Sequence, residues 1–222
     1  MFRYCLFDLD GTLTDPREGI TKSVQHALRA FGIEESDLTK LEPFIGPPLK
    51  DSFMEFYGFT EEQAVKAIKI YRERFAPIGV LENQILPGVS QMLEKLQKAG
   101  IHLAVASSKP TIFVRQILQH FSIEQYFDVI VGSELDGTRG TKEEVVEEAL
   151  RQLGVLTMQV DKRHSSCAMI GDRKFDMQGA KAHGITGVGV EFGFAQPGEL
   201  EAEGADYIAN TVEELQEYLL KD

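Results

Sequence analysis

The stretch that decides the fold is Tyr4-Cys5-Leu6-Phe7-Asp8-Leu9-Asp10-Gly11-Thr12. Its first four residues are apolar and predict a short buried strand, and Gly11 predicts the turn that follows it. Asp8 and Asp10 stand at the carboxyl end of this strand, where ligands bind in open α/β sheets. Because side chains two residues apart on a strand point the same way, we expect both carboxylates to face one ligand.

The close spacing of Asp8 and Asp10 has a chemical consequence. Two neighbouring carboxylates raise each other's pKa unless a cation or a proton compensates their charge. The pair therefore indicates either a bound metal ion or one carboxylate that carries a proton. A calcium-binding loop also begins with Asp-x-Asp, but Gly11 comes too early for one, and Gly19 stands where the closing Glu is required.

Beyond Gly88, predicted strands and helices alternate regularly. We expect strands at 101–106, 127–131, 166–170, 185–190 and 207–209, and helices at 89–96, 112–121, 142–153, 177–182 and 212–220. This alternation predicts a parallel, doubly wound sheet, and the nearly continuous apolar runs indicate strands covered on both faces. The predicted fold is α/β, with a three-layer, Rossmann-like parallel sheet as its core.

The segment between the first strand and Gly88 breaks the alternation. Apolar residues recur at helical spacing over 20–31, 49–56 and 61–75, and no strand is evident among them. The simplest interpretation is a helical insertion, hinged near Pro16 and near Leu86-Pro87-Gly88. We therefore expect a core domain of residues 1–15 and 85–222 and a helical cap domain of residues 16–84.

Composition argues against several classes of partner. The 222 residues carry 23 Lys and Arg against 35 Asp and Glu, a net charge of −12, which argues against nucleic acid and anionic membranes. Cys5 and Cys167 lie in apolar runs and are expected to be buried thiols. With no leader pattern and no membrane-spanning run, we expect a cytoplasmic protein, a monomer or a homodimer.

Polar residues follow four predicted strands and suit phosphoryl transfer: Asp8 and Asp10; Ser107, Ser108 and Lys109; Lys142; and Asp172 with Asp176. A carboxylate can attack phosphorus to form an aspartyl-phosphate. A second carboxylate can protonate the leaving oxygen and then deprotonate the attacking water. A small phosphorylated metabolite is therefore the expected partner.

Oxygen ligands from Asp8, the Asp10 carbonyl and Asp172 suit Mg²⁺, with Asp176 holding a metal-bound water. The Lys142 ammonium and the Ser107 hydroxyl are expected to bind phosphoryl oxygens. Two alternatives stay open at this point. Arg139 and Lys109 are the alternatives to Lys142 as the cation, and a pair of serines is more often a helix N-cap than a phosphate ligand.

These residues resemble the haloacid dehalogenase superfamily, specifically its phosphatases with a helical cap inserted after the first motif. That family's DxDGT motif is matched by residues 8–12, its Ser or Thr by Ser107, its Lys by Lys142, and its GDxxxD motif by residues 171–176. The resemblance implies that Asp8 is the nucleophile and Asp10 the general acid and base. It also implies Mg²⁺ bound by Asp8, Asp10 and Asp172, with Asp176 in support.

We expect substrate contacts from Gly11, Thr12, Ser108, Phe44 and Gly46, and the alternative for Phe44 is a place in the apolar core of the helical insertion. The resemblance also extends to a branch of the family. The 44–49 loop and the 193–206 segment look like the phosphoglycolate phosphatase-like branch. That branch usually has Asn in place of Ser108 and Pro in place of Glu143. The tract 135–142 looks more like relatives described as nucleotidases or general phosphatases.

The expected function is a Mg²⁺-dependent phosphomonoester hydrolase, phosphoglycolate phosphatase-like, that works through an aspartyl-phosphate. The alternatives within the superfamily are a 5'-nucleotidase and a phosphosugar phosphatase or mutase. Dehalogenation is disfavoured because it does not need Asp10 to protonate an oxygen leaving group. A phosphoacceptor module similar to response-regulator receivers is the non-enzymatic alternative, but a helical insertion would be foreign to it.

Overall fold

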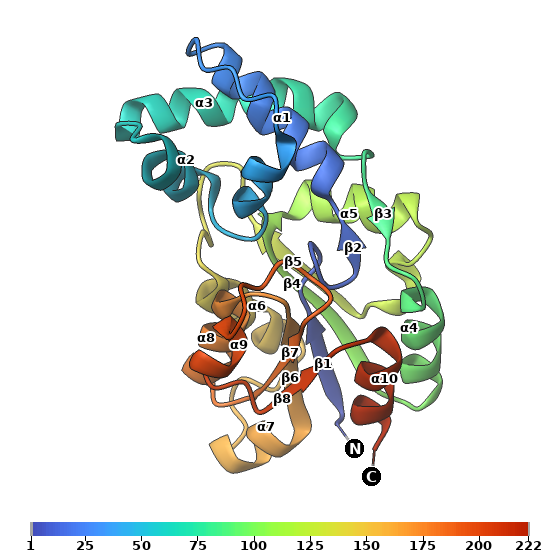
Figure 1. Ribbon diagram of the computed structural model, residues 1–222. Coiled ribbons are helices and arrows are strands. Elements are labelled where there is room, and N and C mark those ends of the chain that lie inside the picture. The colour runs from blue at the N-terminus through green and yellow to red at the C-terminus, as the bar shows by residue number, and fades with distance from the viewer. Residues whose placement is uncertain (1, 222) are drawn as a thin grey trace. The chain divides into compact units, whose positions relative to one another are not determined.

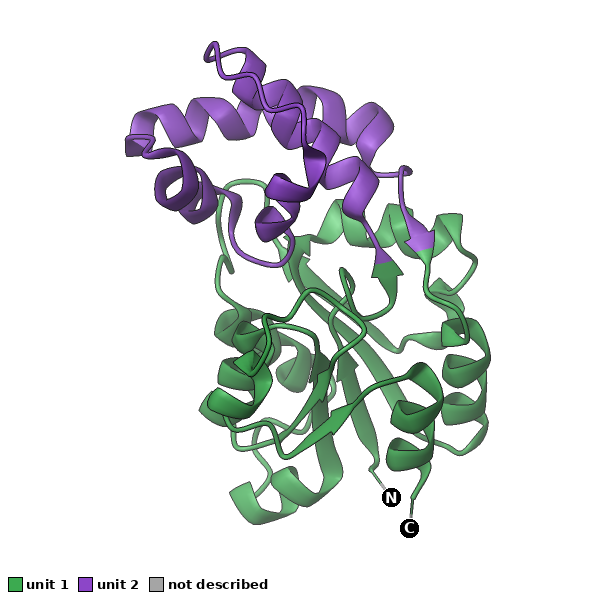
Figure 2. Cartoon of the chain, viewed as in Figure 1, with its two compact units in different colours: residues 1–14, 85–222 green, residues 15–84 purple. Residues whose placement is uncertain are grey.

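The computed structural model describes residues 2–221, and the chain forms two compact units. Unit 1 comprises residues 1–14 and 85–222, and unit 2 comprises residues 15–84 (Figure 2). The two passages between them are the short strands β2 (Thr14–Asp15) and β3 (Gln84–Ile85), which form a two-stranded sheet. The assignment of residues 16–84 as a cap domain stays a prediction.

Unit 1 is built on a six-stranded sheet of order β5-β4-β1-β6-β7-β8, whose neighbours pair in parallel. The strands are β1 (Tyr4–Phe7), β4 (His102–Pro110), β5 (Val129–Ser133), β6 (Cys167–Gly171), β7 (Thr186–Val190) and β8 (Tyr207–Ala209). The predicted Rossmann-like α/β fold is confirmed. Strand β4 extends further than expected, so that Ser107 and Ser108 lie within it.

Helices lie on both faces of this sheet (Figure 1). One face carries α6 (Lys142–Gln152) and α8 (Lys174–Ala182). The other carries α4 (Val89–Lys98), α5 (Thr111–His120) and α10 (Val212–Leu220). The sequence did not predict the short helices η3 (Glu124–Tyr126), α7 (Val160–Ser166) and α9 (Glu199–Ala202).

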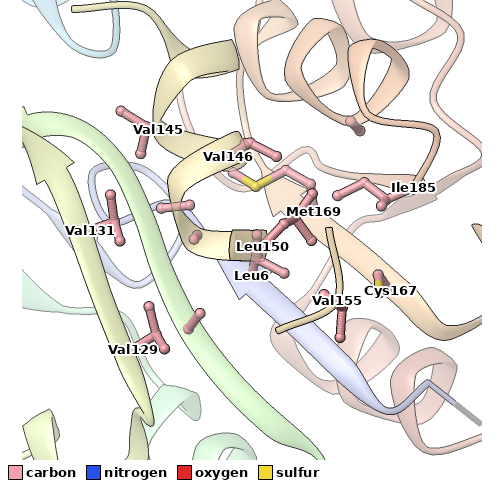
Figure 3. Close-up of a cluster of buried hydrophobic side chains, with 14 residues drawn as sticks. Leu6, Val129, Val131, Val145, Val146, Leu150, Val155, Cys167, Met169 and Ile185 are labelled. Carbon is pink, nitrogen blue, oxygen red and sulfur yellow. The ribbon is translucent and has the colours of Figure 1, made fainter. Parts of the chain in front are cut away.

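The space between the sheet and α6 is filled by apolar side chains (Figure 3). Leu6 of β1 and Met169 of β6 are fully buried there, as are Val146 and Leu150 of α6. Burying each such side chain stabilises the fold by about 1.5–3 kcal/mol. Strand β1 is therefore held at the centre of the sheet, and the residues that follow it start from a rigid support.

The register of β1 decides which residues meet at its carboxyl end. Phe7 pairs with Val105 of β4 on one side and with Ile170 of β6 on the other. The Asp8 N–H also donates to the Ile170 carbonyl at 2.9 Å. The polar residues that follow these three strands therefore emerge at one edge of the sheet.

Unit 2 is helical and has an aromatic core of its own. It contains α1 (Arg17–Arg29), η1 (Leu38–Phe44), α2 (Leu49–Tyr57), α3 (Glu61–Arg74) and the π-helical turn η2 (Phe75–Gly79). The Phe44 and Phe53 rings lie 5.0 Å apart between centroids and are buried. Among the described residues, no helix is both long and apolar enough to cross a bilayer.

Candidate active site

Three aspartates form a compact acidic group at the carboxyl edge of the unit 1 sheet. Asp8 follows β1, whereas Asp172 and Asp176 lie after β6, and each offers a carboxylate oxygen within 4.8 Å of the other two. Asp172 and Asp176 are fully buried and Asp8 is 5% exposed. The structure thus brings Asp8 together with two carboxylates that lie 164 and 168 residues further along the sequence.

Lys142 is the cation that contacts this acidic group. Its Nζ lies 3.0 Å from Asp8 Oδ1 and 2.8 Å from Asp176 Oδ1, and it donates to the Ala106 carbonyl at 3.0 Å. Burial disfavours the charged form of Lys142, but the two carboxylates outweigh that effect and raise its pKa. Lys142 therefore stays protonated and neutralises part of the negative charge.

A capping box sets the position of Lys142. The Thr141 hydroxyl accepts from the Glu144 N–H at 3.3 Å, and the Glu144 carboxylate accepts from the Thr141 N–H at 3.1 Å. This reciprocal pair satisfies backbone donors at the start of α6. The capping box therefore fixes where α6 begins, and Lys142 is its first residue.

Asp10 has a different partner and a different environment. Its Oδ2 lies 2.7 Å from Lys109 Nζ, and both side chains are at most 10% exposed. Its Oδ1 is buried and has no hydrogen-bond partner among the described residues. Burial raises the pKa of Asp10, although Lys109 offsets part of that effect. A carboxyl group that holds its proton more tightly than usual is suited to donate that proton during a reaction.

An irregularity in β4 brings Lys109 to Asp10. The pairing of β4 with β5 shifts between Ala106 and Pro110, which marks a β-bulge. Bulges redirect side chains and are frequent beside active sites. Sequence reasoning considered Lys109 only as a substitute for Lys142 and missed its contact with Asp10, because the bulge depends on strand pairing and leaves no local signal.

The acidic group fits a divalent cation. Burial, and then the charges of Asp176 and Asp8, raise the pKa of Asp172 well above its usual value. Burial likewise raises the pKa of Asp176, despite the opposing effect of Lys142. Three buried carboxylates beside one lysine leave negative charge uncompensated, and oxygen donors of this kind are what Mg²⁺ binds. The site therefore suits a cation of charge +2.

Glycines allow the backbone to approach these carboxylates closely. A Cβ on Gly11, whose φ is +82°, would lie 2.1 Å from Asp172 Oδ2. A Cβ on Gly171 would lie 2.0 Å from Asp176 Cγ, and one on Gly193 would lie 2.3 Å from Asp172 Cβ. Any larger residue at these positions would displace a carboxylate. The close packing of Gly193 was not expected from sequence.

Other predicted residues have defined places in unit 1. Thr12 donates from Oγ1 to Asp172 Oδ1 at 3.3 Å, so it supports the acidic group directly. Ser107 is 2% exposed, and its Oγ accepts from the Lys109 N–H at 3.4 Å. The Ser108 carbonyl accepts from Ser133 Oγ at 2.8 Å.

The structure bears on two alternatives that the sequence left open: the serines as a helix N-cap, and the identity of the cation. Helix α5 begins at Thr111, after Pro110, without a side-chain cap, so the serines of β4 are not its N-cap. Arg139 forms an ion pair with Glu134 and donates from Nε to the Gly132 carbonyl. Lys142, the cation favoured from the sequence, lies with its Nζ 3.0 Å from Asp8 Oδ1.

Phe44 and Gly46 belong to unit 2. The Phe44 ring is 2% exposed and packs against Phe53 and Phe56. Gly46 has a φ of +102°, a conformation that favours glycine and accounts for its presence in this loop. Their expected contacts with substrate stay predictions.

The comparison with protein families gives one extended match. Residues 5–190 match the model of the family described as haloacid dehalogenase-like hydrolase. The matched range begins within β1 and ends with β7, so it includes all four aspartates and both lysines described above.

Several proteins are similar to this chain over most of its length. A 5'-nucleotidase of Pseudomonas aeruginosa is 50% identical over 89% of this chain and 86% of its own. The tyrosine-protein kinase PtkA of Mycobacterium tuberculosis is 39% identical over 96% and 71%. A phosphoglycolate phosphatase of Colwellia psychrerythraea is 27% identical over 95% and 93%. The crystal structure of a predicted phosphatase from Clostridium acetobutylicum covers all of both chains, with 47% identity and a TM-score of 0.94.

Proposed function

The chain belongs to the haloacid dehalogenase-like hydrolases and is a phosphatase of that superfamily; from this premise we propose that it is a Mg²⁺-dependent phosphomonoester hydrolase that forms an aspartyl-phosphate on Asp8. One observation carries the proposal. Asp8 and Asp10, two residues apart, have separate lysine partners, Lys142 and Lys109. Asp8 lies beside the carboxylates of Asp172 and Asp176, whereas burial raises the pKa of Asp10 despite the opposing charge of Lys109.

We assign Asp8, Asp172 and Asp176 to the metal site, with the Asp10 carbonyl as a further ligand. When bound, Mg²⁺ supplies positive charge that offsets the negative charge of the carboxylates and of the phosphoryl group. Lys142 supplies a fixed positive charge beside Asp8, and the Ser107 hydroxyl is a donor for a phosphoryl oxygen.

In the first step, an Asp8 carboxylate oxygen attacks phosphorus in line with the leaving group. A bond forms between that oxygen and phosphorus as the bond from phosphorus to the ester oxygen breaks. Asp10 donates its proton to the departing oxygen, so the product leaves as a neutral alcohol. The raised pKa of Asp10 favours this protonated starting state.

In the second step, water attacks phosphorus and restores the free enzyme. Asp10, now ionised, takes a proton from that water while the bond between phosphorus and the Asp8 oxygen breaks. Inorganic phosphate leaves, and Asp8 is a free carboxylate again. Lys109 stabilises the ionised form of Asp10 between the two steps, because its Nζ lies 2.7 Å from Asp10 Oδ2.

Within this reaction class we propose a nucleoside 5'-monophosphate as the first substrate to test. The relative named 5'-nucleotidase is 50% identical, whereas the relative named phosphoglycolate phosphatase is 27% identical. The departures at Ser108 and Glu143 from the phosphoglycolate phosphatase-like pattern agree with this order.

The test is a hydrolysis screen with and without Mg²⁺. The panel comprises nucleoside 5'-monophosphates, phosphoglycolate, sugar phosphates and pyrophosphate, and Asp8→Asn serves as the inactive control. We expect Mg²⁺-dependent phosphate release that is highest with a nucleoside 5'-monophosphate. Hydrolysis of another ester alone would overturn the substrate assignment, and phosphate transfer to a second sugar hydroxyl would indicate a mutase. No Mg²⁺-dependent release from any ester would overturn the proposed reaction.

A further inference from the structure

Glu199 anchors the loop that borders the acidic group. This loop, residues 191–198, runs from β7 to α9, and Glu199 is the first residue of α9. Glu199 Oε1 accepts from Arg173 Nε at 3.0 Å and from the Lys174 N–H at 2.7 Å. Glu199 Oε2 accepts from the Gln196 N–H at 3.0 Å. One carboxylate therefore ties the 191–198 loop to the turn that carries Asp172.

The anchored loop makes direct contact with Asp172. The Phe194 N–H donates to Asp172 Oδ2 at 2.8 Å. Gly193 packs so closely that a Cβ on it would lie 2.5 Å from Asp172 Oδ2. The backbone of this loop thus contacts the Asp172 carboxylate directly, whereas the partners of Glu199 are Arg173, the Lys174 N–H and the Gln196 N–H, so Glu199 acts on Asp172 through the loop.

The ion pair between Arg173 and Glu199 is largely buried. The Arg173 and Glu199 side chains are 11% and 10% exposed. Hydrogen bonds from Gln196, Lys174 and Arg173 lower the pKa of Glu199, although burial alone would raise it. The carboxylate is therefore ionised at neutral pH, when it accepts all three hydrogen bonds.

We propose that Glu199 is a positioning residue that sets the Mg²⁺ affinity of the acidic group, by holding the 191–198 loop against Asp172. The inference rests on the proposed function, because it requires that the acidic group binds Mg²⁺. Groups that orient metal ligands typically change metal affinity or activity by about 10–100-fold when they are removed. Sequence reasoning found no role for Glu199, because its partners lie 25 or more residues away along the chain or in the loop itself.

The test measures Mg²⁺ binding to the intact protein by calorimetry, in wild type, Glu199→Ala and a matched control. Glu214→Ala is that control, because Glu214 also fixes a loop by accepting from a backbone N–H, that of Asn210, at 2.8 Å. We expect Glu199→Ala to raise the Mg²⁺ dissociation constant about tenfold or more, with Glu214→Ala within about twofold of wild type. At saturating Mg²⁺, kcat of Glu199→Ala should return to within about threefold of wild type.

Glu199→Ala removes the carboxylate that pairs with the largely buried Arg173 side chain, and the variant is at risk of unfolding. Glu199→Gln is therefore measured beside it, because it keeps one oxygen acceptor and loses the other. We expect Glu199→Gln to weaken Mg²⁺ binding by about threefold or more. Arg173→Met, which removes the side-chain partner and leaves both backbone donors, should lie between Glu199→Ala and wild type.

Two results would overturn the inference. One is a Mg²⁺ dissociation constant within about twofold of wild type in Glu199→Ala, or in Glu199→Gln if Glu199→Ala does not fold. The other is an equal weakening in Glu214→Ala, which would indicate a general loss of rigidity. If wild type does not bind Mg²⁺ in a manner abolished by Asp172→Asn, the proposed metal site fails and the inference fails with it.

Discussion

Asp8 and Asp10 carry the same side chain two residues apart, yet their surroundings give them different chemistry. Asp8 Oδ1 accepts from the Leu9 N–H at 2.7 Å, and Asp8 lies beside Lys142 and the carboxylates of Asp172 and Asp176. Asp10 has one lysine partner and one buried oxygen without a hydrogen bond among the described residues. Pairs of carboxylates whose environments differ in this way divide into a nucleophile and an acid in many enzymes.

The nucleophile assignment predicts the effect of Asp8→Asn. The amide has nearly the same shape as the carboxylate but cannot attack phosphorus, so kcat should fall about 10³-fold or more. Steady-state phosphate release measures this, and circular dichroism checks that the fold is intact. A folded variant that keeps about a tenth of wild-type kcat would contradict the assignment.

The acid assignment predicts a dependence on the leaving group for Asp10→Asn. With an alkyl phosphate, turnover should fall about 10²–10⁴-fold, because neither the leaving oxygen nor the water exchanges a proton with the side chain. With p-nitrophenyl phosphate the leaving group needs no proton, so the first step should persist and the second should not. Stopped-flow absorbance should then show a burst of p-nitrophenolate followed by slow turnover. The same fractional loss with both esters and no burst would exclude Asp10 as the acid.

At the scale of elements, the sequence predicted what apolar runs and motifs encode locally. Strand β8 and helix α10 have the predicted bounds, and α6 begins at the predicted Lys142. What escaped prediction depends on contacts between segments distant in sequence. The β4 bulge arises from pairing with β5, and α9 has four residues, too few to show a helical period.

Helix α6 offers a prediction that separates stability from function. Thr141→Ala and Thr60→Ala each remove one capping box, at the start of α6 and of α3 respectively. Each variant should lower the melting temperature by about 2–4 °C, the equivalent of roughly 1 kcal/mol. Only Thr141→Ala should lower kcat/KM severalfold, because the next residue is Lys142. The account of α6 would be wrong if the two variants lost the same catalytic efficiency.

At the scale of the whole molecule, the candidate site places buried carboxylates that repel one another in a chain that is strongly acidic. The net charge is −12, and this total includes Asp10, Asp172 and Asp176, whose carboxyl groups are buried near Asp8. The field of the whole chain does not attract an anionic substrate, so local positive charge has to do so. Lys142, Lys109 and a bound cation supply that charge in our account.

This repulsion predicts how stability depends on pH without metal. The folded-state pKa values of Asp10, Asp172 and Asp176 are raised, so the folded protein binds their protons more tightly than the unfolded chain does. Their contribution to stability is therefore fully present below about pH 4 and is lost as the pH rises through the raised values. Metal-free protein should become less stable as the pH increases from about 5 to about 8.

Thermal denaturation with EDTA and with Mg²⁺ measures this dependence. Added Mg²⁺ should raise the melting temperature more at about pH 8 than at about pH 5, because it replaces the lost protons as the compensating charge. Asp172→Asn should melt higher than wild type without metal at the upper pH and should gain less from Mg²⁺. A Mg²⁺-induced shift of the same size at both pH values would contradict this electrostatic account.

The most direct test of the central claim is to identify the covalent intermediate. Protein quenched in acid during turnover with its best ester and Mg²⁺ is digested, and its peptides are mapped by mass spectrometry. Our account predicts a phosphoryl group on Asp8 that accumulates in Asp10→Asn and is absent from Asp8→Asn. A phosphoryl group on any other residue, or rapid turnover with no phosphorylated peptide in wild type or in Asp10→Asn, would contradict it.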